Sequence, residues 1–169
     1  MGIRRRSIHV RGRWAIRAVL ALLLACAAAH GADYYVSPDG ADTAAGTAAA
    51  PWATIGRGLG ALSAGDTLHV LEGTYDESNT LSGLRGTAEA PIVVRGENMP
   101  LVRAAGRDGF LLIDGSEHIV FDGLEIAGAT RAGILGGHVR DITVRNCRIR
   151  DNAKWQIQTA LCERIAVEN

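Results

Sequence analysis

The sequence is poor in the features from which active sites are most readily recognised. Only 5% of its 169 residues are aromatic, so the core must be built from aliphatic and small side chains. It contains no phosphate-binding loop, no Gly-x-Ser-x-Gly motif, no Cys-x-x-Cys pair and no His-x-x-x-His pair. His69, His118 and His138 are scattered along the chain, which favours ordinary surface or turn positions over metal ligands. No chemistry is therefore assigned by a local motif.

Positive charge is also scarce once the first segment is set aside. The net charge of the whole sequence is zero, but residues 1–32 hold six arginines and no acidic residue. The remaining chain has 12 basic and 18 acidic residues, a net charge of −6. Binding of nucleic acid requires a basic face. The charge of residues 33–169 therefore argues against nucleic acid as a partner.

Residues 1–32 have the pattern of an export signal. An arginine-rich start is followed by an apolar stretch over residues 18–29 and then by small residues. This stretch of about 12 residues is shorter than the roughly 20 that a membrane-spanning helix needs. We therefore expect a secreted or periplasmic protein. Residues 23–26 (Leu-Leu-Ala-Cys) also match a lipobox, which is the alternative to an ordinary signal peptide. In that case Cys26 is lipidated and the protein is held at an outer membrane or cell surface.

One spacing organises the rest of the chain. Ile119, Ile142 and Ile165 stand 23 residues apart, and a fixed period in this range indicates a repeat architecture. The residues around each isoleucine alternate between apolar and polar, as in short strands with one buried face. Glycines and β-branched runs argue against a solenoid of helices. The pattern predicts stacked coils of parallel strands, each buried against its neighbours.

The polar residues of the repeat support the same register. Acidic and basic residues alternate along each outward column of the 23-residue alignment. These columns are Glu117/Arg140/Glu163, His118/Asp141/Arg164, Asp122/Arg145/Glu168 and Glu125/Arg148. Because neighbouring strands lie about 4.8 Å apart, opposite charges in a column attract each other. Gly123, Asn146 and Asn169 form a turn column, since Gly and Asn tolerate left-handed backbone.

Two cysteines remain after the export signal, Cys147 and Cys162. Export permits a disulfide, but a separation of 15 residues does not stack the two in a 23-residue coil. Cys147 aligns with Leu124 and Cys162 aligns with Val139. Both are therefore predicted to be small apolar residues of the core.

Residues 33–75, ahead of the repeat, have the pattern of a cap. A strand ends at the Pro-Asp-Gly turn of residues 38–40, and residues 67–71 form another strand. Between them, residues 52–62 carry apolar side chains at helical spacing, although each of three glycines disfavours the helix by about 1 kcal/mol. The first coil of a solenoid exposes unpaired backbone groups. We expect this helix to cover them, with Trp52 as its packing anchor.

Six short segments between residues 35 and 95 form a further signature. They are Tyr-Val-Ser-Pro-Asp-Gly at 35–40, Gly-Thr at 46–47, Pro-Trp-Ala-Thr-Ile at 51–55, Gly-Asp-Thr at 65–67, Gly-Thr-Tyr at 73–75 and the block from Gly86 to Arg95. They resemble the opening of secreted right-handed parallel β-helix proteins, which include pectate-lyase-like polysaccharide lyases and epimerases. The resemblance covers residues 34–169. It implies an all-β, right-handed, single-stranded parallel β-helix, with the cap at 33–75 and coils at 76–169.

The resemblance also implies a carbohydrate-active protein that acts on uronic-acid polymers. In such lyases a Lys or Arg base takes the C5 proton of the sugar, while Ca²⁺ held by carboxylates neutralises the sugar carboxylate. The third copy of the repeat stops at Asn169, and we expect the calcium ligands beyond it, so no catalytic residue is carried over. This chain is then an N-terminal portion, inactive alone and monomeric when complete. The alternative is a non-catalytic scaffold for glycan binding or adhesion.

Three residues are candidates for contact with an acidic polysaccharide. Arg131 and Lys154 are 23 residues apart and therefore stack on one outer edge, just before the second strand of each coil. Two superposed cations suit a polyanionic glycan, and the neighbouring Trp155 has a ring that is able to stack on a sugar. Asp151 and Asn152 precede them and are expected to cap a loop.

Overall fold

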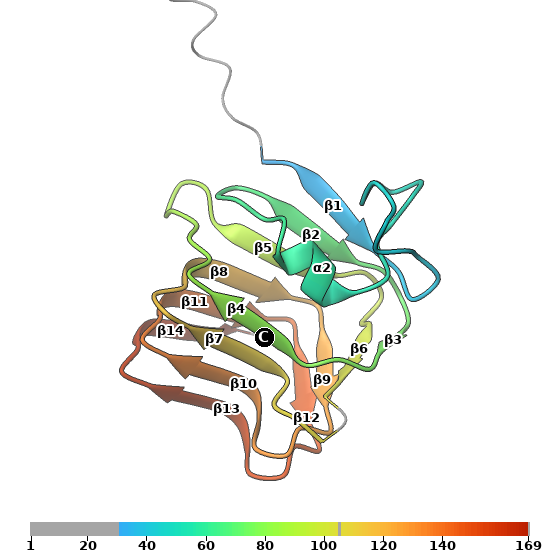
Figure 1. The fold of residues 1–169 in the computed structure, drawn as a ribbon. Coiled ribbons are helices and arrows are strands. Elements are labelled where there is room, and N and C mark those ends of the chain that lie inside the picture. The colour runs from blue at the N-terminus through green and yellow to red at the C-terminus, as the bar shows by residue number, and fades with distance from the viewer. Residues whose placement is uncertain (1–30, 105, 169) are drawn as a thin grey trace, which may run out of the picture.

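The computed structural model describes residues 31–104 and 106–168 (Figure 1). Nearly all of the predicted export signal, including Cys26, lies outside these residues. In the described part of the chain, no helix combines the length and the apolar character needed to cross a bilayer. The chain winds through three parallel sheets that enclose one core, and α2 lies at the end where the first coils begin (Figure 1).

The largest sheet contains six parallel strands stacked in chain order. Its strands are β1 (Asp33–Val36), β2 (Thr67–Val70), β5 (Ile92–Gly96), β8 (Glu117–Asp122), β11 (Arg140–Arg145) and β14 (Glu163–Glu168). Two four-stranded sheets complete each coil. The first consists of β3 (Thr74–Tyr75), β6 (Leu101–Arg103), β9 (Glu125–Ala127) and β12 (Arg148–Arg150). The second consists of β4 (Asn79–Ser82), β7 (Phe110–Ile113), β10 (Ala132–Gly137) and β13 (Trp155–Ala160), which confirms the predicted single-stranded parallel β-helix.

The 23-residue register is confirmed in the coils from which it was read. Ile142 pairs with Ile119 on one side and with Ile165 on the other. Earlier coils are longer, as the wider spacing between paired residues shows. Val93 pairs with Thr67 in the coil before it and with Val120 in the coil after it. The additional residues lie in the connections between strands, such as 83–91, so these coils do not repeat at a fixed interval.

The core is a stack of buried ladders along the axis of the coil. Ile119 and Phe121 are fully buried in β8, and the rings of Phe110 and Phe121 lie 5.0 Å apart between centroids. Cys147 and Cys162 are unpaired and half-buried, and both pack against this core. Burial raises the pKa of the Cys147 thiol. Both cysteines therefore occupy the positions that their alignment predicted.

The cap helix α2 (Ile55–Leu59) is shorter than the helix predicted over residues 52–62. Thr54 is its N-cap, and the Glu77 carboxylate accepts hydrogen bonds from the first two helical N–H groups. Gly58 packs closely on the core, since a Cβ there would lie 2.5 Å from the side chain of Leu68, which would have to move. The helix ends at Leu59 with Gly60 as its C-cap, and three glycines within five residues leave little intrinsic helix propensity. Contacts with β1, β2 and β4 place it over the first coil, as expected.

Trp52 fixes the segment that leads into the cap helix. Its side chain is 3% exposed, and its indole N–H donates to the carbonyl of Ala44 at 2.9 Å. The ring stacks on Tyr34 at 5.2 Å, and the Arg57 guanidinium lies 4.3 Å from the ring centroid. Trp52 is therefore the packing anchor that the sequence predicted.

The outward charge columns provide a test of the register. Arg145 pairs in register with Asp122 and Glu168, and its guanidinium donates to Asp122 at 3.0 Å. Replacing Arg145 by glutamate stacks three carboxylates on adjacent strands. We expect the free energy of unfolding to fall by about 1–2 kcal/mol, measured by chemical denaturation. Arg107→Glu changes the net charge equally at an exposed site and should cost much less; equal losses would contradict the register.

Candidate functional site

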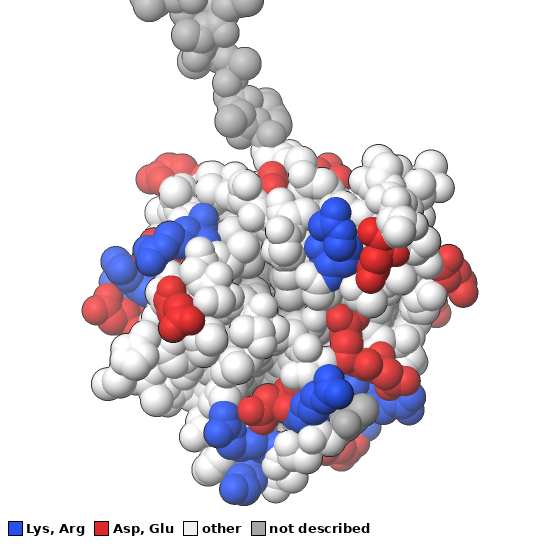
Figure 2. All heavy atoms as spheres, in the orientation of Figure 1, with Lys and Arg blue, Asp and Glu red and all other residues white. Residues whose placement is uncertain are grey.

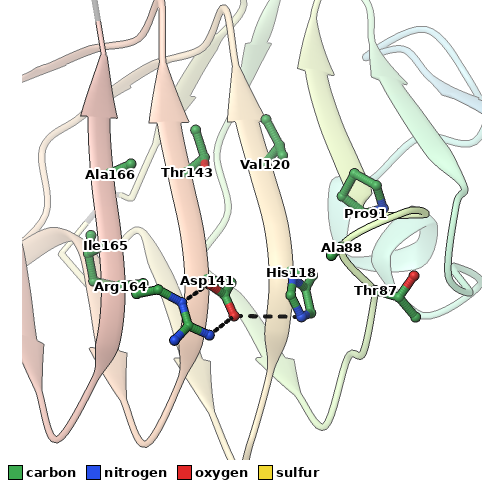
Figure 3. A pocket seen from close by; sticks show the side chains of 10 residues that line it. All are labelled: Thr87, Ala88, Pro91, His118, Val120, Asp141, Thr143, Arg164, Ile165 and Ala166. Atoms are coloured by element: carbon green, nitrogen blue, oxygen red, sulfur yellow. Dashed lines mark hydrogen bonds and ion pairs between the residues drawn. The ribbon is translucent and has the colours of Figure 1, made fainter.

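A groove of about 510 Å³ crosses the outer face of the six-stranded sheet (Figure 3). Val120, Thr143 and Ala166 pair in register on three successive strands and form its uncharged floor. A second row of lining residues runs beside them, and Figure 3 shows the loop that precedes β5 closing one end. The second row consists of His118, Asp141 and Arg164, and the loop contributes Thr87, Ala88 and Pro91. The groove therefore runs across the strands, along the axis of the β-helix.

The second row has unusual backbone geometry. His118, Asp141 and Arg164 have φ angles of 52°, 54° and 50°, in the left-handed region. Such a conformation costs of order 1 kcal/mol or more for a residue other than glycine. Each of these three residues lies between two residues that pair in register with a neighbouring strand, but it does not itself pair. The ladder of paired residues is therefore interrupted at the same level in three coils. The coil geometry thus imposes this conformation and arranges the three side chains in one row (Figure 3).

Asp141 is the centre of this row. The Arg164 guanidinium donates to both carboxylate oxygens of Asp141, at 2.6 Å for the Nη2 contact. The Nε2 atom of His118 lies 3.6 Å from the carboxylate on the other side. The hydrogen bond from Arg164 is the main reason why the pKa of Asp141 lies below the usual aspartate range. Asp141 is therefore an ionised acceptor at neutral pH.

The three residues predicted to contact a glycan lie together at another site, the starts of β10 and β13. The N–H groups of Lys154 and Trp155 both donate to the carbonyl of Arg131, at 3.2 and 2.9 Å, so the predicted stacking is present. The Arg131 guanidinium pairs with Asp108 at 3.2 Å. We call Arg131, Lys154 and Trp155 the Trp155 surface. Their contact with a glycan remains a prediction.

The exposure of the Trp155 surface is favourable for ligand contact. Trp155 is 45% exposed, and the Lys154 ammonium lies 5.9 Å from its ring centroid. Within the described part of the chain, no carboxylate pairs with Lys154. In Figure 2, Lys and Arg side chains gather with acidic ones at the lower end of the molecule, over the connections that lead into β10 and β13.

Asn152 holds the loop that carries this surface. Its Oδ1 accepts from the N–H of Ala129 in the preceding coil at 2.9 Å, and its Nδ2 donates to Gln156 at 2.9 Å. Asp151 pairs with its neighbour Arg150. Both residues therefore act within the loop, as the sequence predicted, and Asn152 ties the loop to the coil beside it.

The acidic side chains of the described residues do not fit a calcium ion. Across residues 31–104 and 106–168, no three His, Cys, Asp or Glu side chains converge on one point. Carboxylates in the coils pair with arginines instead: Glu117 pairs with Arg85 and Arg140, at 2.9 and 3.2 Å. Because Ca²⁺ takes six to eight oxygen ligands, the described residues do not form a calcium site.

The groove was not predicted from the sequence. The alternation of charge predicts the column His118/Asp141/Arg164, and the scattered histidines predict a surface position for His118, but neither pattern predicts a groove. The available signal was the uncharged outward column formed by residues 120, 143 and 166. A column of uncharged residues beside columns of charged residues indicates a groove with an uncharged floor and charged sides. It does not reveal the left-handed backbone.

Comparison with known proteins agrees with this architecture. Residues 38–83 match a family described as "Protein of unknown function (DUF1565)". Pectate lyase PEL9 of Emericella nidulans (strain FGSC A4) is 34% identical over an alignment of 155 positions, gaps included, and the match covers 79% of this chain. The matched region is 36% of PEL9, so this chain spans about a third of that relative.

Solved structures show the same fold. The pectate lyase Pel9A has a TM-score of 0.57 at 20% identity, covering 77% of this chain and 46% of its own. A GH136 lacto-N-biosidase from Eubacterium ramulus has a TM-score of 0.60 at 17% identity, covering 89% and 32%. A rhamnogalacturonan lyase has a TM-score of 0.52 at 18% identity, covering 69% and 36%. The chain is therefore a right-handed parallel β-helix protein that is similar in sequence to a pectate lyase and in fold to solved lyase structures.

Proposed function

We propose that this chain belongs to an exported, carbohydrate-active protein and holds a uronic-acid polymer at the Trp155 surface. The similarity to pectate lyase PEL9 over 79% of the chain supports the substrate class. The arginine-rich, then apolar pattern of residues 1–32 supports export. The observation that carries the proposal is an exposed tryptophan with two cations on adjacent coils.

The residues of the Trp155 surface are placed to make different contributions to ligand binding. The exposed ring of Trp155 offers a flat apolar face to the C–H face of a sugar. The Lys154 ammonium is free of carboxylates in the described part of the chain and is positioned to meet a uronate carboxylate. Arg131 already pairs with Asp108 and would have to share its guanidinium. We therefore expect Trp155 and Lys154 to contribute more to affinity than Arg131.

Calorimetric titration with an oligogalacturonate of defined length tests the proposal. We expect Trp155→Ala to weaken binding by about tenfold or more, and Lys154→Ala by about fivefold, since 1.4 kcal/mol corresponds to a factor of ten. Arg85→Ala removes a cation from an exposed site in the connection between β4 and β5, and Leu161→Ala removes a side chain that is 77% exposed. Both controls should bind like the unaltered chain. Unchanged binding by the two Trp155-surface variants would disprove the assignment.

A non-catalytic glycan-binding scaffold is the second candidate. The observation that favours it is the pairing of carboxylates with arginines along the outward columns, which leaves no converging acidic cluster among the described residues. Incubation of the whole protein to which this chain belongs, rather than of this chain alone, with polygalacturonate or alginate separates the two. Release of unsaturated uronate, detected by its absorbance, supports a lyase. Binding without any such product supports the scaffold.

A further inference from the structure

The groove on the six-stranded sheet has no part in the function proposed above. It lies on β8, β11 and β14, whereas the Trp155 surface lies at the starts of β10 and β13 in another sheet. We propose that this groove is a separate subsite for an uncharged, hydroxyl-rich glycan segment. It goes beyond the uronic-acid site and does not depend on it.

The charges beside the groove cancel at short range. Asp141 lies between His118 and Arg164, and Arg164 gives two of its N–H groups to that carboxylate. In the column on the far side of the floor, Arg145 pairs in register with Asp122 and Glu168. A polyanion would find each guanidinium already matched, and a polycation would find the carboxylates of Asp122 and Asp141 matched. An uncharged ligand is therefore the class that this face does not repel and that does not have to displace an existing ion pair.

The floor of the groove suits the face of a sugar chain. Val120, Thr143 and Ala166 are short side chains on three adjacent strands, so they form a low strip roughly 10 Å long at the usual strand spacing. Methyl groups on this strip can contact the C–H face of a pyranose. The row beside it supplies polar groups for hydroxyls: the Asp141 carboxylate accepts, the Arg164 guanidinium donates, and the imidazole of His118 does either.

A peptide strand is a poorer occupant than a glycan. Strand addition needs an exposed sheet edge with free backbone groups. The groove lies on a sheet face, where the backbone of β11 is already paired with β8 and β14. The ligand must therefore bring its own donors and acceptors and bind through side chains. Since the groove runs across three strands along the axis of the β-helix, an extended polymer segment fits it better than an enclosed small molecule.

Titration with three neutral probes, xylohexaose, cellohexaose and galactohexaose, tests this inference. We expect saturable binding of at least one probe to the full chain. Thr143→Trp fills the floor and should weaken this binding by about tenfold or more. Thr67→Trp is the matched control: Thr67 occupies the same register column and is also half-buried, but it lies outside the groove. It should bind the probe like the unaltered chain, as should Trp155→Ala.

A second measurement keeps the test independent of how well Thr143→Trp folds. In the unaltered chain, NMR signals from the methyl groups of Val120, Thr143 and Ala166 should shift as the neutral probe is added. Oligogalacturonate affinity should be the same in Thr143→Trp as in the unaltered chain. A failure of the groove proposal can therefore be distinguished from a failure of the proposal for the Trp155 surface. The inference is overturned if no neutral probe binds, if binding leaves these methyl signals unmoved, or if Thr143→Trp weakens only oligogalacturonate.

Discussion

Replacing Phe121 by alanine should lower the free energy of unfolding by about 3–5 kcal/mol. Phe121 is fully buried and pairs in register with Val94 on one side and Val144 on the other. Its ring also lies 5.0 Å from that of Phe110 in another sheet. Because these neighbours are held at fixed heights by their own ladders, they cannot collapse into the space that the ring leaves. Chemical denaturation monitored by circular dichroism measures the loss.

Val120→Ala is the control for Phe121→Ala. Val120 is the adjacent residue of β8, but its side chain points outward into the groove. Its removal should cost about 1 kcal/mol or less, as for other partly exposed positions. If the two substitutions destabilised the chain equally, the assignment of inward and outward faces along β8 would be wrong.

Trp52→Ala should have the second largest effect, a loss of about 3–5 kcal/mol. The substitution removes the stacking on Tyr34, the contact with Arg57 and the hydrogen bond to Ala44 together. It should also loosen the cap that covers the first coil, so we expect aggregation to begin at a lower temperature than in the unaltered chain. Thermal unfolding with light-scattering detection measures both effects.

Trp155→Ala provides a matched comparison, because it removes the same side chain from a position that is 45% exposed. We expect its melting temperature to stay close to that of the unaltered chain. A large loss of stability in Trp155→Ala, or a negligible one in Trp52→Ala, would show that the functions assigned to the two tryptophans are reversed.

The later coils were predicted well because their chemistry repeats at a constant interval. Ile119, Ile142 and Ile165 occupy one ladder, and the alternating charges around Arg145 are paired across strands as the alignment required. The earlier coils have connections of unequal length, so no period was visible there. The helix was predicted over too long a span, since the apolar side chain of Leu62 is buried although the helix ends before it.

The candidate sites were predicted unequally for a physical reason. The stacking of Arg131 and Lys154 follows from the register alone, which the sequence contains. The groove depends on left-handed backbone at His118, Asp141 and Arg164. Of these three residue types, only aspartate and histidine are even moderately common in that conformation. Residue type therefore did not indicate it, and the packing of successive coils determines it.

Hydrogen–deuterium exchange of the full chain with and without saturating oligogalacturonate tests the central claim most directly. We expect the ligand to slow amide exchange in residues 128–133 and 152–158, which carry the Trp155 surface and the loop that Asn152 holds. The Lys154→Ala/Trp155→Ala double variant should lose this protection while exchange in the core strands is unchanged. Protection confined to other coils, or the same protection in the double variant, would contradict the proposal that a uronic-acid polymer binds here.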